Sequence, residues 1–150
     1  MLAERDERLI IAYLGAFHDL QERRSLWQEI VAWTEIGLEY VRFYGDKRRE
    51  AVLLANLGAA WAALGEVKRA LELQHQRLAI EEALGDETQI GRALGNLGSV
   101  YHRLGEVSRA VAYYQRALAI ARSTGDRSNE GIWLQMLGFA YVDLGDAQRN

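Results

Sequence analysis

Glycine recurs through this chain at a fixed interval of 40 residues. Three columns of glycines share the spacing: Gly45, Gly85 and Gly125; Gly58, Gly98 and Gly138; Gly65, Gly105 and Gly145. Self-similarity with a period of roughly 20–50 residues is the signature of a repeat architecture, in which each unit buries its apolar face against its neighbours. The period therefore requires a fold built from stacked units, and single-core folds without internal repetition are excluded.

Each period divides into two helical patterns. In the second block, apolar residues and Gly98 follow the spacing of one helix face from Leu94 to Leu104, and a second stripe runs from Val107 to Ala121. The 150 residues include no proline, which would break a helix interior. We therefore predict an all-α chain of antiparallel helix pairs.

Two of the glycine columns mark the ends of helices. Glycine supplies the left-handed conformation just past a helix end, and an aspartate that follows can cap the next helix. Gly45-Asp46, Gly85-Asp86 and Gly125-Asp126 have this form, which places unit boundaries there. The third column, which contains Gly58, Gly98 and Gly138, lies within helices, where a missing side chain lets a neighbouring helix approach closely.

These boundaries divide the chain into one continuous domain of repeats. Residues 45–84 and 85–124 are complete units, and 125–150 form a partial unit with a first helix and the start of a second. Residues 1–44 form a divergent helical hairpin or cap. There Ser25 stands in place of the turn glycine, and Gln28 three residues later is typical of a capping box.

The placement of residues within a unit resembles the tetratricopeptide-repeat (TPR) family. The positions that carry the resemblance in the second block are Leu94, Leu97-Gly98, Tyr101, Ala110, Tyr114 and Ala117. The 40-residue form without proline is similar to the long-repeat scaffolds of the LGN/Pins and kinesin-light-chain type, and to the arrays of bacterial STAND-type regulators. The resemblance implies a right-handed α-solenoid in which the first helix of each pair lines a concave face.

Composition and motifs argue against several classes of function. A net charge of −3 provides no basic footprint for nucleic acid or anionic membrane, and no segment is long and apolar enough to span a bilayer. No cysteine is present, the three histidines lack metal-ligand spacing, and no P-loop or catalytic constellation is found. We expect a cytoplasmic protein that is not an enzyme, with no cofactor and no metal.

Surface recognition remains as the expected activity, through the exposed side of the first helices. The resemblance implies that Asn56 and Asn96 occupy the groove position at which TPR proteins hydrogen-bond a peptide; alternatively, these amides bond a neighbouring helix. The candidate peptide-binding residues are Asn56, Asn96, Arg92, Ser99, His102, Arg103, Gln135 and Phe139. Because the groove is apolar at both ends with a basic centre, an amphipathic helix or extended segment fits better than a dicarboxylate clamp.

The C-terminal end suggests an alternative function. The last unit leaves an apolar stripe of Leu137, Tyr141 and Leu144 without its usual partner helix. We expect either that the chain is a fragment of a longer array, such as a STAND-type sensor region, or that the stripe pairs with another copy. The alternative is therefore a structural module that stacks or oligomerises through this end.

Overall fold

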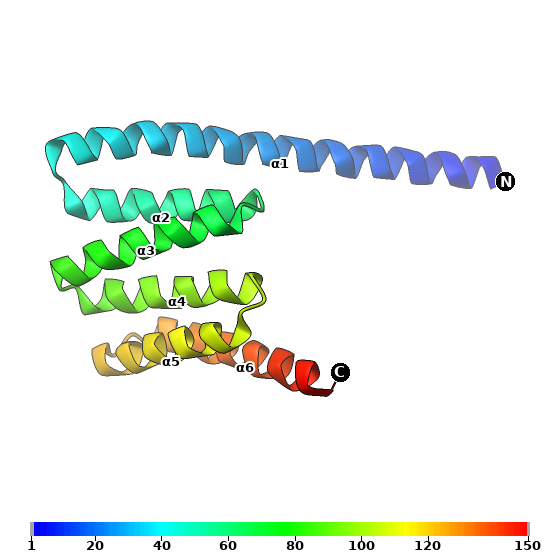
Figure 1. The fold of residues 1–150 in the computed structure, drawn as a ribbon. Helices are drawn as coiled ribbons and strands as arrows, with labels where there is room; N and C mark the ends of the chain where they lie inside the picture. Colours follow the sequence, from blue (N-terminus) through cyan, green and yellow to red (C-terminus); the bar gives the residue numbers. More distant parts are fainter. Residues whose placement is uncertain (1, 150) are drawn as a thin grey trace.

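The fold was examined in a computed structural model, which describes the backbone of residues 2–149 and the side chains of residue 16 and residues 19–149. Over these residues the chain is helical and contains no strand. The helices are α1 (Leu2–Tyr44), α2 (Lys47–Ala63), α3 (Val67–Leu84), α4 (Glu87–Arg103), α5 (Val107–Thr124) and α6 (Arg127–Arg149). Each helix packs against the next along the chain, so α1 to α6 stack in sequence order (Figure 1). The predicted all-α solenoid is confirmed.

The turns between helices follow the predicted glycine and aspartate positions. The turn glycines with a left-handed backbone are Gly45, Gly65, Gly85, Gly105 and Gly125, with φ between 71° and 86°. After three of them an aspartate caps the next helix: the Asp46, Asp86 and Asp126 carboxylates accept hydrogen bonds from the N–H groups of Arg49, Gln89 and Asn129. The helix ends are thus set by local residues at each boundary.

The glycines inside helices allow close packing where a second helix is present. A Cβ at Gly98 would lie 2.7 Å from the Tyr114 ring, and one at Gly58 would lie 2.8 Å from Nε2 of Gln74. Both predictions of close approach are confirmed. At Gly138 a Cβ would meet nothing within 4 Å, because no described helix covers that side of α6.

The predicted hairpin in residues 1–44 is wrong, since α1 runs without a break through Ser25 and Gln28. The turns at the equivalent positions use Gly65 and Gly105 in the left-handed conformation. Ser25 offers no such freedom, because a Cβ makes that conformation costly. Continuing the helical hydrogen bonds is then favoured. The C-terminal half of α1 packs on α2 through an apolar stripe that includes Val31, Leu38 and Val41.

The predicted start of a second helix after Gly145 is also wrong. Helix α6 continues through Gly145 to Arg149, and Gly145 does not adopt the left-handed conformation. The same Leu-Gly-acid sequence forms a turn at Gly65 and Gly105, where Val67 and Val107 open helices that pack back on their partners. The described residues after Gly145 do not fold back as a second helix, so the helical hydrogen bonds of α6 continue through it.

The core differs in chemistry between the two complete units. Around α4, α5 and α6 it is apolar and centres on Tyr114, Leu94 and Leu97. In α3 three polar side chains are buried where α5 carries Tyr114, Ala117 and Ala121; they are Gln74, Arg77 and Glu81. Burial lowers the pKa of Arg77, and the nearby Glu81 carboxylate opposes that change. The first unit therefore has the more polar core.

Candidate functional site

Helices α2, α4 and α6 are joined to one another by side chains on one face. Nη2 of Arg103 on α4 donates a hydrogen bond to the carbonyl oxygen of Ala62 on α2, at 2.8 Å. Nε2 of His102 lies 2.5 Å from the Asp143 carboxylate of α6. We call the surface that these three helices present beside these contacts the inner face.

Contact between α4 and α6 also depends on a glycine. The Trp133 ring of α6 lies directly against Gly95, where any Cβ would overlap it. Trp133 also stacks beside Tyr114, with ring centroids 6.2 Å apart. Helical periodicity alone places Gly95 on the open side of α4. The contact depends instead on pairing a glycine with a tryptophan 38 positions later, which periodicity does not predict.

The two predicted asparagines lie on the inner face with free amides. Asn56 on α2 is exposed and Asn96 on α4 is half-buried. Among the described residues neither side-chain amide has a hydrogen-bond partner, so neither bonds a neighbouring helix. Because an amide both donates and accepts hydrogen bonds, each of the two asparagines can bond a peptide group of a bound main chain.

The predicted basic and polar centre is largely occupied by contacts within the chain. The Ser99 hydroxyl donates to the Gly95 carbonyl oxygen at 3.3 Å and accepts from the Tyr114 hydroxyl at 3.2 Å. His102 and Arg103 make the bonds described above, and Arg92 lies 3.8 Å from the Asp126 carboxylate. Apart from the Gly95 carbonyl oxygen, these partners lie on other helices. The centre therefore positions helices and leaves Arg92, which is exposed, as its most available cation.

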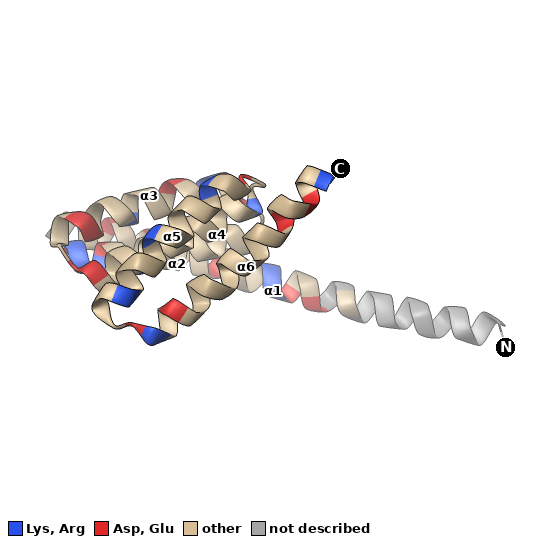
Figure 2. Ribbon diagram, turned by 90° about the horizontal axis from the view of Figure 1, so that it is seen from below, with Lys and Arg blue, Asp and Glu red and all other residues tan. Residues whose placement is uncertain are grey.

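Apolar side chains flank the asparagines on the inner face. Phe139 on α6 is 52% exposed and Gln135 beside it is exposed, and Val52 on α2 is also exposed. Figure 2 shows charged residues on α6 only toward its two ends. The inner face thus has free amides on α2 and α4 beside exposed apolar side chains on α2 and α6.

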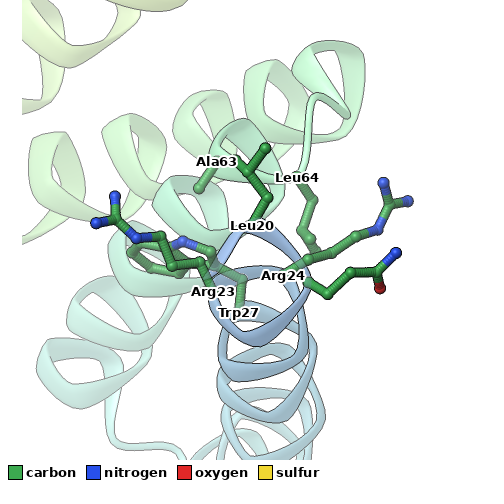
Figure 3. Close-up of a pocket in the computed structure, with 7 residues that line it drawn as sticks. Leu20, Arg23, Arg24, Trp27, Ala63 and Leu64 are labelled. Atoms are coloured by element: carbon green, nitrogen blue, oxygen red, sulfur yellow. The ribbon is translucent and has the colours of Figure 1, made fainter. Parts of the chain in front are cut away.

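A shallow hollow of about 440 Å³ lies between α1 and the end of α2 (Figure 3). Its lining includes Leu20, Trp27 and Leu64, and the side chains of Arg23 and Arg24 point to opposite sides of α1. This hollow was not predicted from the sequence, because a turn was expected at Ser25. In the sequence, the hollow corresponds to the adjacent arginines Arg23 and Arg24 followed by Trp27.

The three residues of the predicted self-association stripe differ in exposure. Leu137 is buried in the core, so its assignment to an exposed stripe is wrong: it faces the preceding helices, as Leu97 does in α4. Tyr141 is exposed and its hydroxyl accepts a hydrogen bond from Nε2 of Gln115 at 2.9 Å. Leu144 is half-buried.

Comparison with known proteins decides the family. One tetratricopeptide-repeat family model matches residues 51–89 and a second matches residues 89–149. The chain is a tetratricopeptide-repeat protein. Members of the TPR family typically act as protein-interaction scaffolds rather than catalysts. No curated protein matches this TPR chain.

Solved structures agree with this assignment. The TPR chain is similar to BtubC (BKLC) from P. vanneervenii, with a TM-score of 0.70 and 25% identity over 79% of this chain. It spans half of that protein's length. A Podospora anserina protein named as a kinesin light chain, with nearly identical TPR-like repeats, matches at a TM-score of 0.59 and 19% identity, over 87% of this chain and 69% of that one. The similarity to kinesin-light-chain scaffolds is confirmed.

Among the described residues, no helix of the TPR chain is long and apolar enough to cross a membrane. Within the same part of the chain, no group of three His, Cys, Asp or Glu side chains is placed to hold a metal ion.

Proposed function

We propose that this TPR protein is a non-catalytic scaffold whose inner face binds an extended or helical segment of a partner protein. The observation that carries the proposal is the pair of unpartnered amides, Asn56 and Asn96, on adjacent inner-face helices. Each can bond a partner's peptide groups, and desolvated amides left unpaired on binding would cost free energy. The cytoplasm remains the compartment predicted from the sequence.

The flanking side chains indicate what kind of segment would bind. Val52 and Phe139 offer apolar contact on either side of the amides, and Arg92 offers one cation near the centre. We infer a segment with apolar side chains toward both ends and a single acidic residue between them. A ligand with several carboxylates is disfavoured, since His102 and Arg103 already bond Asp143 and Ala62.

Peptides selected from a displayed random library provide the test. A synthetic peptide that binds the wild-type chain should bind the Asn56→Ala/Asn96→Ala variant at least about tenfold more weakly, because two hydrogen bonds of about 1 kcal/mol each are lost. Isothermal titration measures the affinities. Helical content by circular dichroism should be unchanged, since neither amide bonds the fold.

A matched pair of amides on the other helices is the control. Gln76 on α3 and Gln115 on α5 are exposed, and each makes one side-chain hydrogen bond at the surface. Gln76→Ala/Gln115→Ala should leave peptide affinity within about twofold of wild type. Binding that depends on the glutamine pair and not on the asparagine pair would contradict the proposal.

A further inference from the structure

The two ends of the solenoid present apolar faces of different kinds. On α6, Leu134 and Tyr141 are 46% and 51% exposed, and a Cβ at Gly131 or Gly138 would meet nothing within 4 Å. We call this surface, made of Gly131, Leu134, Gly138 and Tyr141, the α6 end face. Exposed apolar side chains that lie together on one helix face are a feature of interaction sites.

The opposite end carries an aromatic strip on α1. Trp33, Tyr40 and Tyr44 are 73%, 62% and 66% exposed on the side of α1 that does not pack on α2. The Tyr40 and Tyr44 rings lie against each other with centroids 4.7 Å apart. We call these three residues, with Thr34 beside them, the α1 end face.

The interface between α4 and α5 shows how two such faces fit together. A Cβ at Gly91 would lie 2.8 Å from Ile120, and one at Gly98 would lie 2.7 Å from the Tyr114 ring. Tyr101 stacks on Tyr113 at a centroid distance of 5.2 Å. Two glycines and a tyrosine on the first helix thus receive three side chains of the second.

The repeat register places the same elements on the two end faces. Gly131, Gly138 and Tyr141 on α6 lie 40 residues after Gly91, Gly98 and Tyr101. On α1, the residues 80 positions before Tyr113, Tyr114 and Ile120 are Trp33, Thr34 and Tyr40. By this register, α6 has the residues of the first helix of a pair on its end face, and α1 has those of the second helix of a pair.

We propose that these two faces bind each other between copies of this chain, α6 of one copy antiparallel to α1 of the next. In the register of α4 and α5, Trp33 stacks on Tyr141, Thr34 covers Gly138 and Tyr40 covers Gly131. The orientation of Tyr141 matches that of Tyr101. The Tyr141 hydroxyl accepts a hydrogen bond from Gln115, and the Tyr101 hydroxyl lies 3.1 Å from Nε2 of His75, which is 40 residues before Gln115.

A second copy is a better occupant than an unrelated protein because its two end faces already have the complementary residues of a helix pair. The contact joins two different faces, so it is heterologous. Any assembly of copies therefore keeps one unpaired face at each of its two ends. Association then continues from copy to copy instead of stopping at a dimer. This inference is independent of peptide binding, since neither end face includes Asn56 or Asn96.

Variants blocked at one face test the proposal by sedimentation velocity. Trp33→Asp/Tyr40→Asp blocks the α1 end face, and Leu134→Asp/Tyr141→Asp blocks the α6 end face. The wild-type chain should form species larger than a dimer as its concentration rises from micromolar to millimolar. Each blocked variant alone should be monomeric, with association at least about tenfold weaker. An equal mixture should form a heterodimer and nothing larger, because one intact face of each kind remains.

Other outcomes would overturn the proposal. A wild-type chain that stays monomeric excludes the contact, and a blocked variant that still dimerises alone indicates pairing of α1 with α1 or of α6 with α6. Leu84→Asp changes an exposed apolar residue of α3, away from both end faces, and should associate like wild type. Circular dichroism establishes that the blocked variants, whose substituted side chains are all substantially exposed, keep wild-type helicity.

Discussion

Tyr114→Ala should lower the free energy of unfolding by about 3–5 kcal/mol, the range for removing a large aromatic side chain from a packed core. Tyr114 is fully buried between α4, α5 and α6, its ring covers Gly98 and stacks beside Trp133, and its hydroxyl bonds Ser99. Burial raises the pKa of its hydroxyl, which the bond to Ser99 opposes in part. Urea denaturation followed by circular dichroism measures the change.

Two companion variants separate the contributions of Tyr114. Tyr114→Phe keeps the ring and loses only the bond to Ser99, so it should cost about 1 kcal/mol. Gly98→Ala adds a Cβ that would lie 2.7 Å from the ring. It should therefore destabilise the wild-type chain and stabilise the Tyr114→Ala background, where only its gain in helix propensity remains. A Tyr114→Ala cost below about 1 kcal/mol would contradict the described packing of α4 and α5.

Glu81→Leu should lower the free energy of unfolding by about 3–5 kcal/mol, because it leaves the buried Arg77 guanidinium without its carboxylate. Nε of Arg77 lies 3.8 Å from Oε1 of Glu81, and their side chains are 8% and 6% exposed. Nε makes no hydrogen bond, and Nη2 donates only a long bond of 3.5 Å to Gln89. The remaining cation thus has no comparable partner nearby.

The double variant gives the opposite result. Arg77→Met/Glu81→Leu replaces both charges by apolar side chains of similar volume, in a position where α5 carries Ala117 and Ala121. It should be as stable as wild type or more stable by about 1–4 kcal/mol, since the desolvation cost of both ions is removed. Denaturation of the three proteins side by side is the measurement. A double variant as unstable as Glu81→Leu would show that the pair stabilises the first unit.

The turns of this fold could be predicted from the sequence because each depends on neighbouring residues. Gly85 must follow a helix end and Asp86 must precede a helix start, and both requirements are visible within a few positions. The path at Ser25 and Gly145 could not be predicted in the same way. There the choice between a turn and a continuing helix depends on whether a second helix gains enough packing, which is a tertiary effect.

The candidate site was predictable to a similar extent. The repeat register placed Asn56 and Asn96 on one face, because a fixed period brings equivalent positions of successive units together. It did not predict that His102 bonds Asp143 or that Arg103 bonds the Ala62 carbonyl oxygen. These contacts join residues about one repeat apart on different helices, and side-chain geometry decides them. The basic residues therefore looked available in the sequence and are partnered in the structure.

Mapping a selected peptide by nuclear magnetic resonance tests the central claim most directly, that the inner face binds a partner segment. The chain has four asparagines, of which Asn129 bonds the Asp126 carboxylate at 2.6 Å and serves as an internal reference. On titration of the peptide, the side-chain amide signals of Asn56 and Asn96 should shift while that of Asn129 stays in place. Shifts confined to residues of α3 and α5, with both inner-face amides unmoved, would contradict the account.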